Sequence, residues 1–169
     1  MLKKLGYVLL TSMLLVGCAQ DTYNEEVSIQ KPIGATSYQE ELDTKASELA
    51  EKLVGNLNLE DSMDAPLGVT VIPSIFFEGE DLEISDGCVY LSKEAGNADT
   101  VAIIKTDEVK KVKKALETYV DTVKSNTEVY HEQDEKFENA VIESNKSTVI
   151  LVVCDDYKTA QKEVDKILE

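Results

Sequence analysis

Three cysteines and one histidine are the rarest of the residues in this chain that commonly carry covalent or acid–base chemistry. A cysteine thiolate is a nucleophile and a metal ligand, and histidine is the commonest general acid or base. His131 lies in a polar segment, and nothing in the sequence places a serine or cysteine nucleophile with an acidic partner beside it, as a triad requires. We therefore expect no catalytic residue, no cofactor and no metal site.

Cys18 differs from the other cysteines because of the residues before it. Lys3 and Lys4 form a basic start, residues 5–16 form an apolar run, and Gly17 directly precedes the thiol. The run is too short for a bilayer, which needs about 20 apolar residues, but it is typical of a secretory signal. The sequence Leu-Val-Gly-Cys resembles the lipobox of bacterial lipoproteins. The resemblance implies cleavage between Gly17 and Cys18 and the attachment of diacylglycerol to the Cys18 thiol.

This signal predicts a protein anchored by lipid to the cell membrane, on its extracytoplasmic face. We expect a lipoprotein signal peptide at residues 1–17, a flexible tether at residues 18–36 and one domain at residues 37–169. Covalent acyl chains would then hold the protein at the membrane, since two chains anchor stably where one does not.

The charge of the chain restricts its partners. The net charge is −16, and removal of residues 1–17 with Lys3 and Lys4 changes it to −18. Nucleic-acid binding depends on neutralising phosphates, and the chain has no arginine to do so. We therefore expect no nucleic-acid partner.

Cys88 and Cys154 each lie in or beside an apolar run that is typical of a strand. An extracytoplasmic location permits a disulfide between them. The alternative, which we take as the default, is two buried thiols that behave as small apolar side chains.

The apolar pattern predicts a domain that mixes helices and strands. Ser37 and Glu40 form a capping box for an amphipathic N-terminal helix, and Gly55 is its expected end. Residues 57–72 are less clear: residues 67–73 fit a short strand or an extended link that ends at Pro73, and a helical turn with Phe76 and Phe77 is expected after it. Four strands are expected at residues 88–92, 100–105, 139–144 and 147–154, with helices that begin behind Asp107 and Asp155.

Residues 100–121 and 148–169 resemble each other at an offset of 48 residues. Each follows a further strand, so the regions 87–124 and 137–169 both read as strand–strand–helix. This pattern predicts an internal ββα repeat. The expected fold is α+β, a two-layer sandwich of about four antiparallel-type strands with helices on one face.

Two charged clusters deserve comparison with binding sites. The loop at residues 78–86 concentrates five acids and could offer oxygens to calcium, but its spacing is not that of an EF-hand, and we favour a solvated loop. The lysines at positions 110, 111, 113 and 114 could meet an anionic surface, although we favour a solvated helix face.

A set of positions along the domain resembles a family of small surface lipoproteins of Firmicutes, domain-of-unknown-function family forty-three fifty-eight. The positions are Tyr90, Ala98, Asp99, Tyr130, Asn139, Ala140, Asp155 and Asp156. The resemblance extends over residues 37–169 and implies an uncharacterised extracytoplasmic lipoprotein. We expect a non-enzymatic binding or adaptor module with an envelope protein as partner. The alternatives are a lipoprotein that binds a small ligand, a peptide or calcium and, last, an enzyme that acts on the cell wall.

Overall fold

The computed structural model describes residues 45–125 and 133–169, which form an α+β fold around a five-stranded antiparallel sheet. The strand order is β1-β2-β3-β5-β4. The strands are β1 (Leu67–Gly68), β2 (Asp86–Leu91), β3 (Thr100–Lys105), β4 (Val141–Ser144) and β5 (Thr148–Val153). The helices are α1 (Ala46–Asn56), the 3-10 turn η1 (Val69–Val71), α2 (Ile72–Phe76), α3 (Val109–Ser125), α5 (Asp134–Glu138) and α6 (Tyr157–Leu168). No helix in these two ranges is long and apolar enough to span a membrane.

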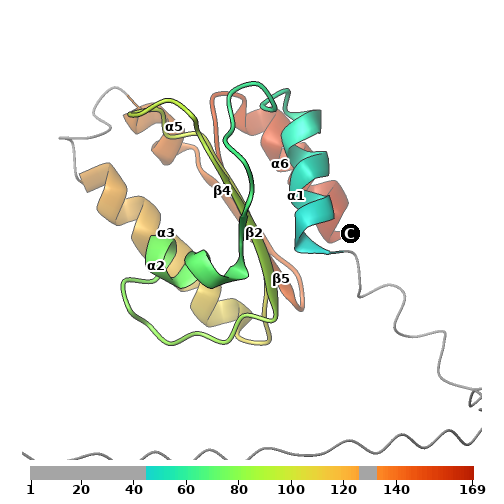
Figure 1. Cartoon of the computed structure of the whole chain (residues 1–169), viewed down its shortest axis with the longest axis vertical. Coiled ribbons are helices and arrows are strands. Elements are labelled where there is room, and N and C mark those ends of the chain that lie inside the picture. The colour runs from blue at the N-terminus through green and yellow to red at the C-terminus, as the bar shows by residue number, and fades with distance from the viewer. Residues whose placement is uncertain (1–44, 126–132) are drawn as a thin grey trace, which may run out of the picture. The chain divides into compact units, whose positions relative to one another are not determined.

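Helices cover both faces of the sheet, so the expectation of helices on one face was wrong, and a fifth strand, β1, joins the four expected. In Figure 1 the sheet lies between α1 and α6 on one side and α2 and α3 on the other. The sheet residues that pack with α2, α3 and α5 are Val89, Ala102, Ile104, Val149, Leu151 and Val153. Those that pack with α1 and α6 are Cys88, Val101, Ile103, Val141, Ile150 and Val152. Such alternation is the strand period of two.

The register of the two central strands explains the placement of the helices. β3 pairs with β5 so that Val101 is opposite Val152 and Ile104 is opposite Val149. Because side chains alternate along a strand, Val101 and Val149, which are equivalent at the 48-residue offset, point to opposite faces. The helices that follow these strands accordingly pack on opposite faces. An origin of the two halves by duplication stays a prediction.

Helix α1 ends at Asn56, one residue after the glycine that the sequence indicated as its end. Asn58 adopts a left-handed conformation (φ 54°), its N–H donates to the Gly55 carbonyl, and the Leu59 N–H donates to the Val54 carbonyl. This is the Schellman arrangement, in which asparagine can replace the usual glycine. The expected start of the helix at Ser37 lies outside the described residues.

The segment between α1 and β2 contains an uncharged run at residues 65–77. It forms β1 at the edge of the sheet, η1 and then α2, where Pro73 occupies the first turn. Proline is tolerated there because the first N–H groups of a helix have no partner within it. Of the two alternatives for residues 67–73, the structure has a strand, but only at Leu67–Gly68, and the expected helical turn is α2, which ends at Phe76. Elements of two and five residues are too short to show a period, so the sequence did not give their bounds.

Candidate functional site

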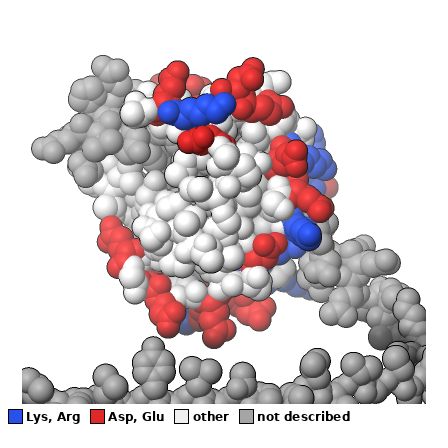
Figure 2. All heavy atoms as spheres, viewed as in Figure 1, with Lys and Arg blue, Asp and Glu red and all other residues white. Residues whose placement is uncertain are grey.

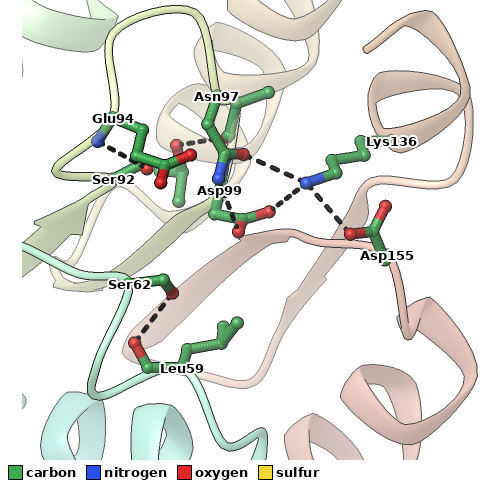
Figure 3. A network of polar contacts seen from close by, with 10 residues as sticks. Leu59, Ser62, Ser92, Glu94, Asn97, Asp99, Lys136 and Asp155 are labelled. Atoms are coloured by element: carbon green, nitrogen blue, oxygen red, sulfur yellow. Dashed lines mark hydrogen bonds and ion pairs between the residues drawn. The ribbon is translucent and has the colours of Figure 1, made fainter.

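A buried lysine on the short helix α5 is the centre of a polar network (Figure 3). The Lys136 ammonium donates to Asp99 Oδ1 at 2.7 Å, to Asn97 Oδ1 at 3.0 Å, and forms an ion pair with Asp155 Oδ2 at 3.1 Å. Asn97 also donates from Nδ2 to the second oxygen of Asp99 at 3.2 Å. The network therefore joins the β2–β3 loop, α5 and the end of β5.

Burial and pairing have opposing effects on Lys136. Its side chain is 9% exposed and that of Asp99 is 7% exposed. Burial alone would lower the pKa of Lys136, but the hydrogen bonds to Asp99 and Asp155 outweigh it, and the pKa is raised above its usual value. All three N–H donors of the ammonium have an acceptor, which is the condition for holding a charge inside a protein.

Beside this network lies a pocket of about 300 Å³. Asn97 and Asp99 line it on the network side, and the carboxylate of Glu94 in the same loop points toward them in Figure 3. The rest of the lining includes the hydroxyl side chains of Ser92 and Thr100 and the apolar or aromatic side chains of Ile75, Leu91, Tyr119 and Phe137. This volume is at the lower end of the range for small-molecule sites. The sequence analysis did not predict this pocket.

A smaller hollow of about 110 Å³ lies on the other side of the network, and Lys136, Cys154 and Asp155 contribute to its lining. The Lys136–Asp99 pair thus lies between two hollows. Burial raises the pKa of the Cys154 thiol to about 11, with a further rise from the negative charge of Asp99. The thiol is therefore protonated at neutral pH and is a poor nucleophile.

Cys88 and Cys154 are both free and buried, so the structure favours the buried-thiol alternative. Cys88 is level with Ile103 and Ile150 in the sheet register, and Cys154 follows Ile150 by four residues. The two Cα atoms are thus separated by about 13 Å along the strands and about 10 Å across them. A disulfide requires Cα atoms about 4.4–6.8 Å apart, which this register does not allow.

Hydrogen bonds between side chains and backbone groups hold the acidic loop at residues 78–86 in place. The Glu83 N–H donates to Glu108 Oε2 at 3.0 Å, and the Thr106 hydroxyl donates to the Glu83 carbonyl at 2.6 Å. Asp86 uses both carboxylate oxygens on N–H groups, those of Ala46 and Gly87. No group of three or more metal-ligating side chains occurs within residues 45–125 and 133–169. The loop therefore gives no support to the calcium alternative.

The lysines that begin α3 are divided between ion pairs and solvent. Lys111 pairs with Glu108, and Lys113 pairs with Glu143 of β4 at 3.4 Å. Lys110 and Lys114 are exposed. Acidic partners thus accompany part of this cluster, as expected of a solvated helix face.

The two aspartates after β5 have different roles from those expected. Asp155 was predicted to cap α6, but the cap is Asp156, whose Oδ1 accepts a hydrogen bond of 3.1 Å from the Thr159 N–H. Asp155 instead turns to Lys136 of α5. Either aspartate fits the capping pattern in sequence, and the lysine that distinguishes them is remote along the chain.

The uncharged run at residues 65–77 is largely on the surface. Leu67 of β1 is 37% exposed and is the one exposed large apolar side chain among the described residues. In Figure 2 acidic side chains border a broad uncharged area, in the region that α2 occupies in Figure 1. A continuous uncharged area on so acidic a protein is unusual and marks a candidate contact surface.

The predicted lipidation and cleavage residues, Cys18 and Gly17, lie outside the described residues. The same holds for His131, for Tyr130 and for the boundaries expected at residues 17 and 36.

Residues 79–154 match the family model of DUF4358, a domain of unknown function. The match confirms the resemblance predicted from the sequence. The DUF4358 match extends over β2 to β5 and includes Asn97, Asp99 and Lys136, but it ends before Asp155 and α6. No curated protein and no solved structure gives a significant match to the chain.

Proposed function

We propose that this protein is a lipid-anchored, non-enzymatic binding module on the extracytoplasmic face of the cell membrane, whose domain contacts another protein of the envelope. The lipobox at Cys18 supports the anchor and the location. The observation that carries the binding role is the uncharged surface of residues 65–77 with acidic residues on either side of it in the sequence, Asp64 and Glu78.

The composition of that surface favours a protein partner. Contact surfaces have centres depleted in charge and a polar border. Leu67, Val69 and Ile75 offer apolar atoms at the surface, while the acidic border would select a partner with basic residues around its own apolar centre.

The chemistry of the titratable groups supports a role without catalysis. A lysine that acts as a base or nucleophile has a lowered pKa, whereas the pKa of Lys136 is raised. A reactive cysteine likewise has a lowered pKa, whereas burial raises the pKa of Cys88 and of Cys154. These groups are arranged to hold the structure together, and turnover of a cell-wall substrate is the least supported function.

A second candidate function is the binding of a small ligand, and the pocket of about 300 Å³ beside Asp99 favours it. A bound ligand stabilises the folded state by mass action, so a rise in melting temperature with ligand is its direct test.

Crosslinking on intact cells, followed by mass spectrometry, tests the proposed function. We expect one abundant envelope partner, which is lost in a Cys18→Ala variant that cannot be lipidated. A Leu67→Glu variant should reduce the yield of that partner strongly. Lys158→Gln on α6 changes the net charge by the same amount and should leave the yield unchanged, because Lys158 is exposed on the other face of the sheet. Equal yields from wild type and Leu67→Glu would refute the proposed surface.

A further inference from the structure

We infer that the pocket between the β2–β3 loop, Tyr119 and Phe137 binds a small organic amine in its protonated, cationic form. This inference rests on the second candidate function above, the binding of a small ligand, and names the class of that ligand. The pocket has three properties that bear on the choice of ligand: its charge, its aromatic walls and its size.

The charge of the pocket favours a cation. Glu94 and Asp99 line it, and no lysine is among its lining residues within residues 45–125 and 133–169. The nearest lysine along the loop is Lys93, and its ammonium donates a hydrogen bond of 3.2 Å to the Asp61 carbonyl. A ligand carboxylate or phosphate would meet uncompensated like charge here, whereas an ammonium group would be attracted.

The network beside the pocket does not cancel this charge. Lys136 is the one cation in the network, and it faces two carboxylates, those of Asp99 and Asp155. With Glu94 the balance is three carboxylates against one ammonium. The Lys136 donors are already used by Asp99, Asn97 and Asp155, so the ammonium is not available to bind an anionic ligand.

The carboxylate of Glu94 is the group best placed to meet the ligand. It lies on the exposed part of the loop, and within the described part of the chain it forms no ion pair. Figure 3 shows it extended toward Asn97 and Asp99, and Glu94 is among the residues that line the pocket.

The remaining walls suit the body of such a ligand. Tyr119 and Phe137 contribute aromatic side chains to the lining, and Ile75 and Leu91 contribute apolar contact. Aromatic rings and cations attract each other. The volume of about 300 Å³ is about twice that of a cavity known to hold benzene, ~150 Å³. The pocket can therefore take an amine with a short apolar chain or a single ring, or one basic side chain of a peptide.

The test compares three probes that share one body and differ in charge: n-butylammonium, 1-butanol and butyrate. Each is titrated into the full chain, purified with its lipid in a non-ionic detergent, and binding is followed through the NMR amide signals of Gly96, Ala98 and Thr100. We expect n-butylammonium to bind about tenfold more tightly than 1-butanol. Butyrate should bind more weakly than both.

Two variants assign the effect to the pocket. Glu94→Gln should weaken n-butylammonium binding about two- to fivefold, the size expected for one partly exposed ion pair, and leave 1-butanol unchanged. Glu117→Gln makes the same change of charge on α3 outside the pocket lining and should leave all three affinities unchanged. Equal affinity for the three probes, preference for butyrate, or no change of these amide signals would overturn the inference. None of these outcomes affects the crosslinking test of the surface around Leu67. Either proposal can therefore fail while the other holds.

Discussion

Asp86, the first residue of β2, accepts a hydrogen bond of 2.7 Å from the backbone N–H of Ala46, 40 residues earlier at the start of α1. Its other oxygen accepts from the Gly87 N–H at 2.8 Å. The residue before the helix, Lys45, provides no cap of its own. A side chain of the sheet therefore caps α1 and ties it to the face that it covers.

This relationship predicts the effect of removing the Asp86 carboxylate. Asp86→Ala leaves the N–H of the buried Ala46 without an acceptor and should lower the free energy of unfolding by about 1–2 kcal/mol. Asp86→Asn keeps one acceptor oxygen and should cost less. Urea unfolding followed by circular dichroism measures both. Equal stability of Asp86→Ala and wild type would show that the hydrogen bond does not contribute.

The Lys136–Asp99 pair predicts an asymmetry between breaking and replacing a buried ion pair. Lys136→Met leaves Asp99 charged and buried, which should cost about 3–5 kcal/mol in free energy of unfolding. The double variant Lys136→Met, Asp99→Leu should recover most of this loss, because neither charge then remains buried. Denaturant unfolding of the four proteins of the cycle gives the coupling energy.

A surface lysine provides the control for this cycle. Lys124 forms an ion pair of 3.7 Å with Glu138, and both side chains are well exposed. Lys124→Met should therefore cost no more than about 1 kcal/mol. A loss of similar size for Lys124→Met and Lys136→Met would argue against a special role for burial.

The sequence predicted local features well and long-range ones poorly. Strand β3 has the expected bounds, 100–105, because its apolar run is bounded by polar residues. The face that each helix covers depends on the register between β3 and β5, which apolar periodicity within one element does not contain. The roles of Asp86 and Asp155 were missed for the same reason, since each depends on a partner remote along the chain.

The pocket could not be predicted from its own residues. The loop of residues 94–99 reads as an ordinary polar turn, and its binding potential arises only where α2, α3 and α5 close over it. A lysine flanked by acids on a short polar helix also reads as solvated, so the sequence offered no signal that Lys136 is buried.

The difference between Asp155 and Asp156 can be tested at acid pH. The hydrogen bond from Thr159 lowers the pKa of Asp156, so its contribution to stability is present above the unfolded pKa and is lost as pH falls through the lower, folded pKa. Asp156→Asn should therefore reduce the fall in stability between about pH 5 and pH 2, measured by thermal unfolding. Asp155→Asn should leave the α6 helix signal in circular dichroism unchanged. If Asp155→Asn reduced the acid-induced fall in stability and Asp156→Asn did not, Asp155 would be the cap of α6.

The buried thiols predict a loss of stability at alkaline pH. Burial raises the pKa of Cys154 from 9.0 to about 11, so the folded state holds a proton that the unfolded state releases. The contribution is complete below about pH 9 and is lost as pH rises toward 11. Cys154→Ala removes this contribution of the thiol to stability and should flatten the decline of melting temperature between those two pH values.

In wild type the Cys154 thiol should react with iodoacetamide at pH 8 only as fast as the domain opens, with denaturant accelerating the reaction. Rapid labelling of the native chain would contradict both the burial and the raised pKa.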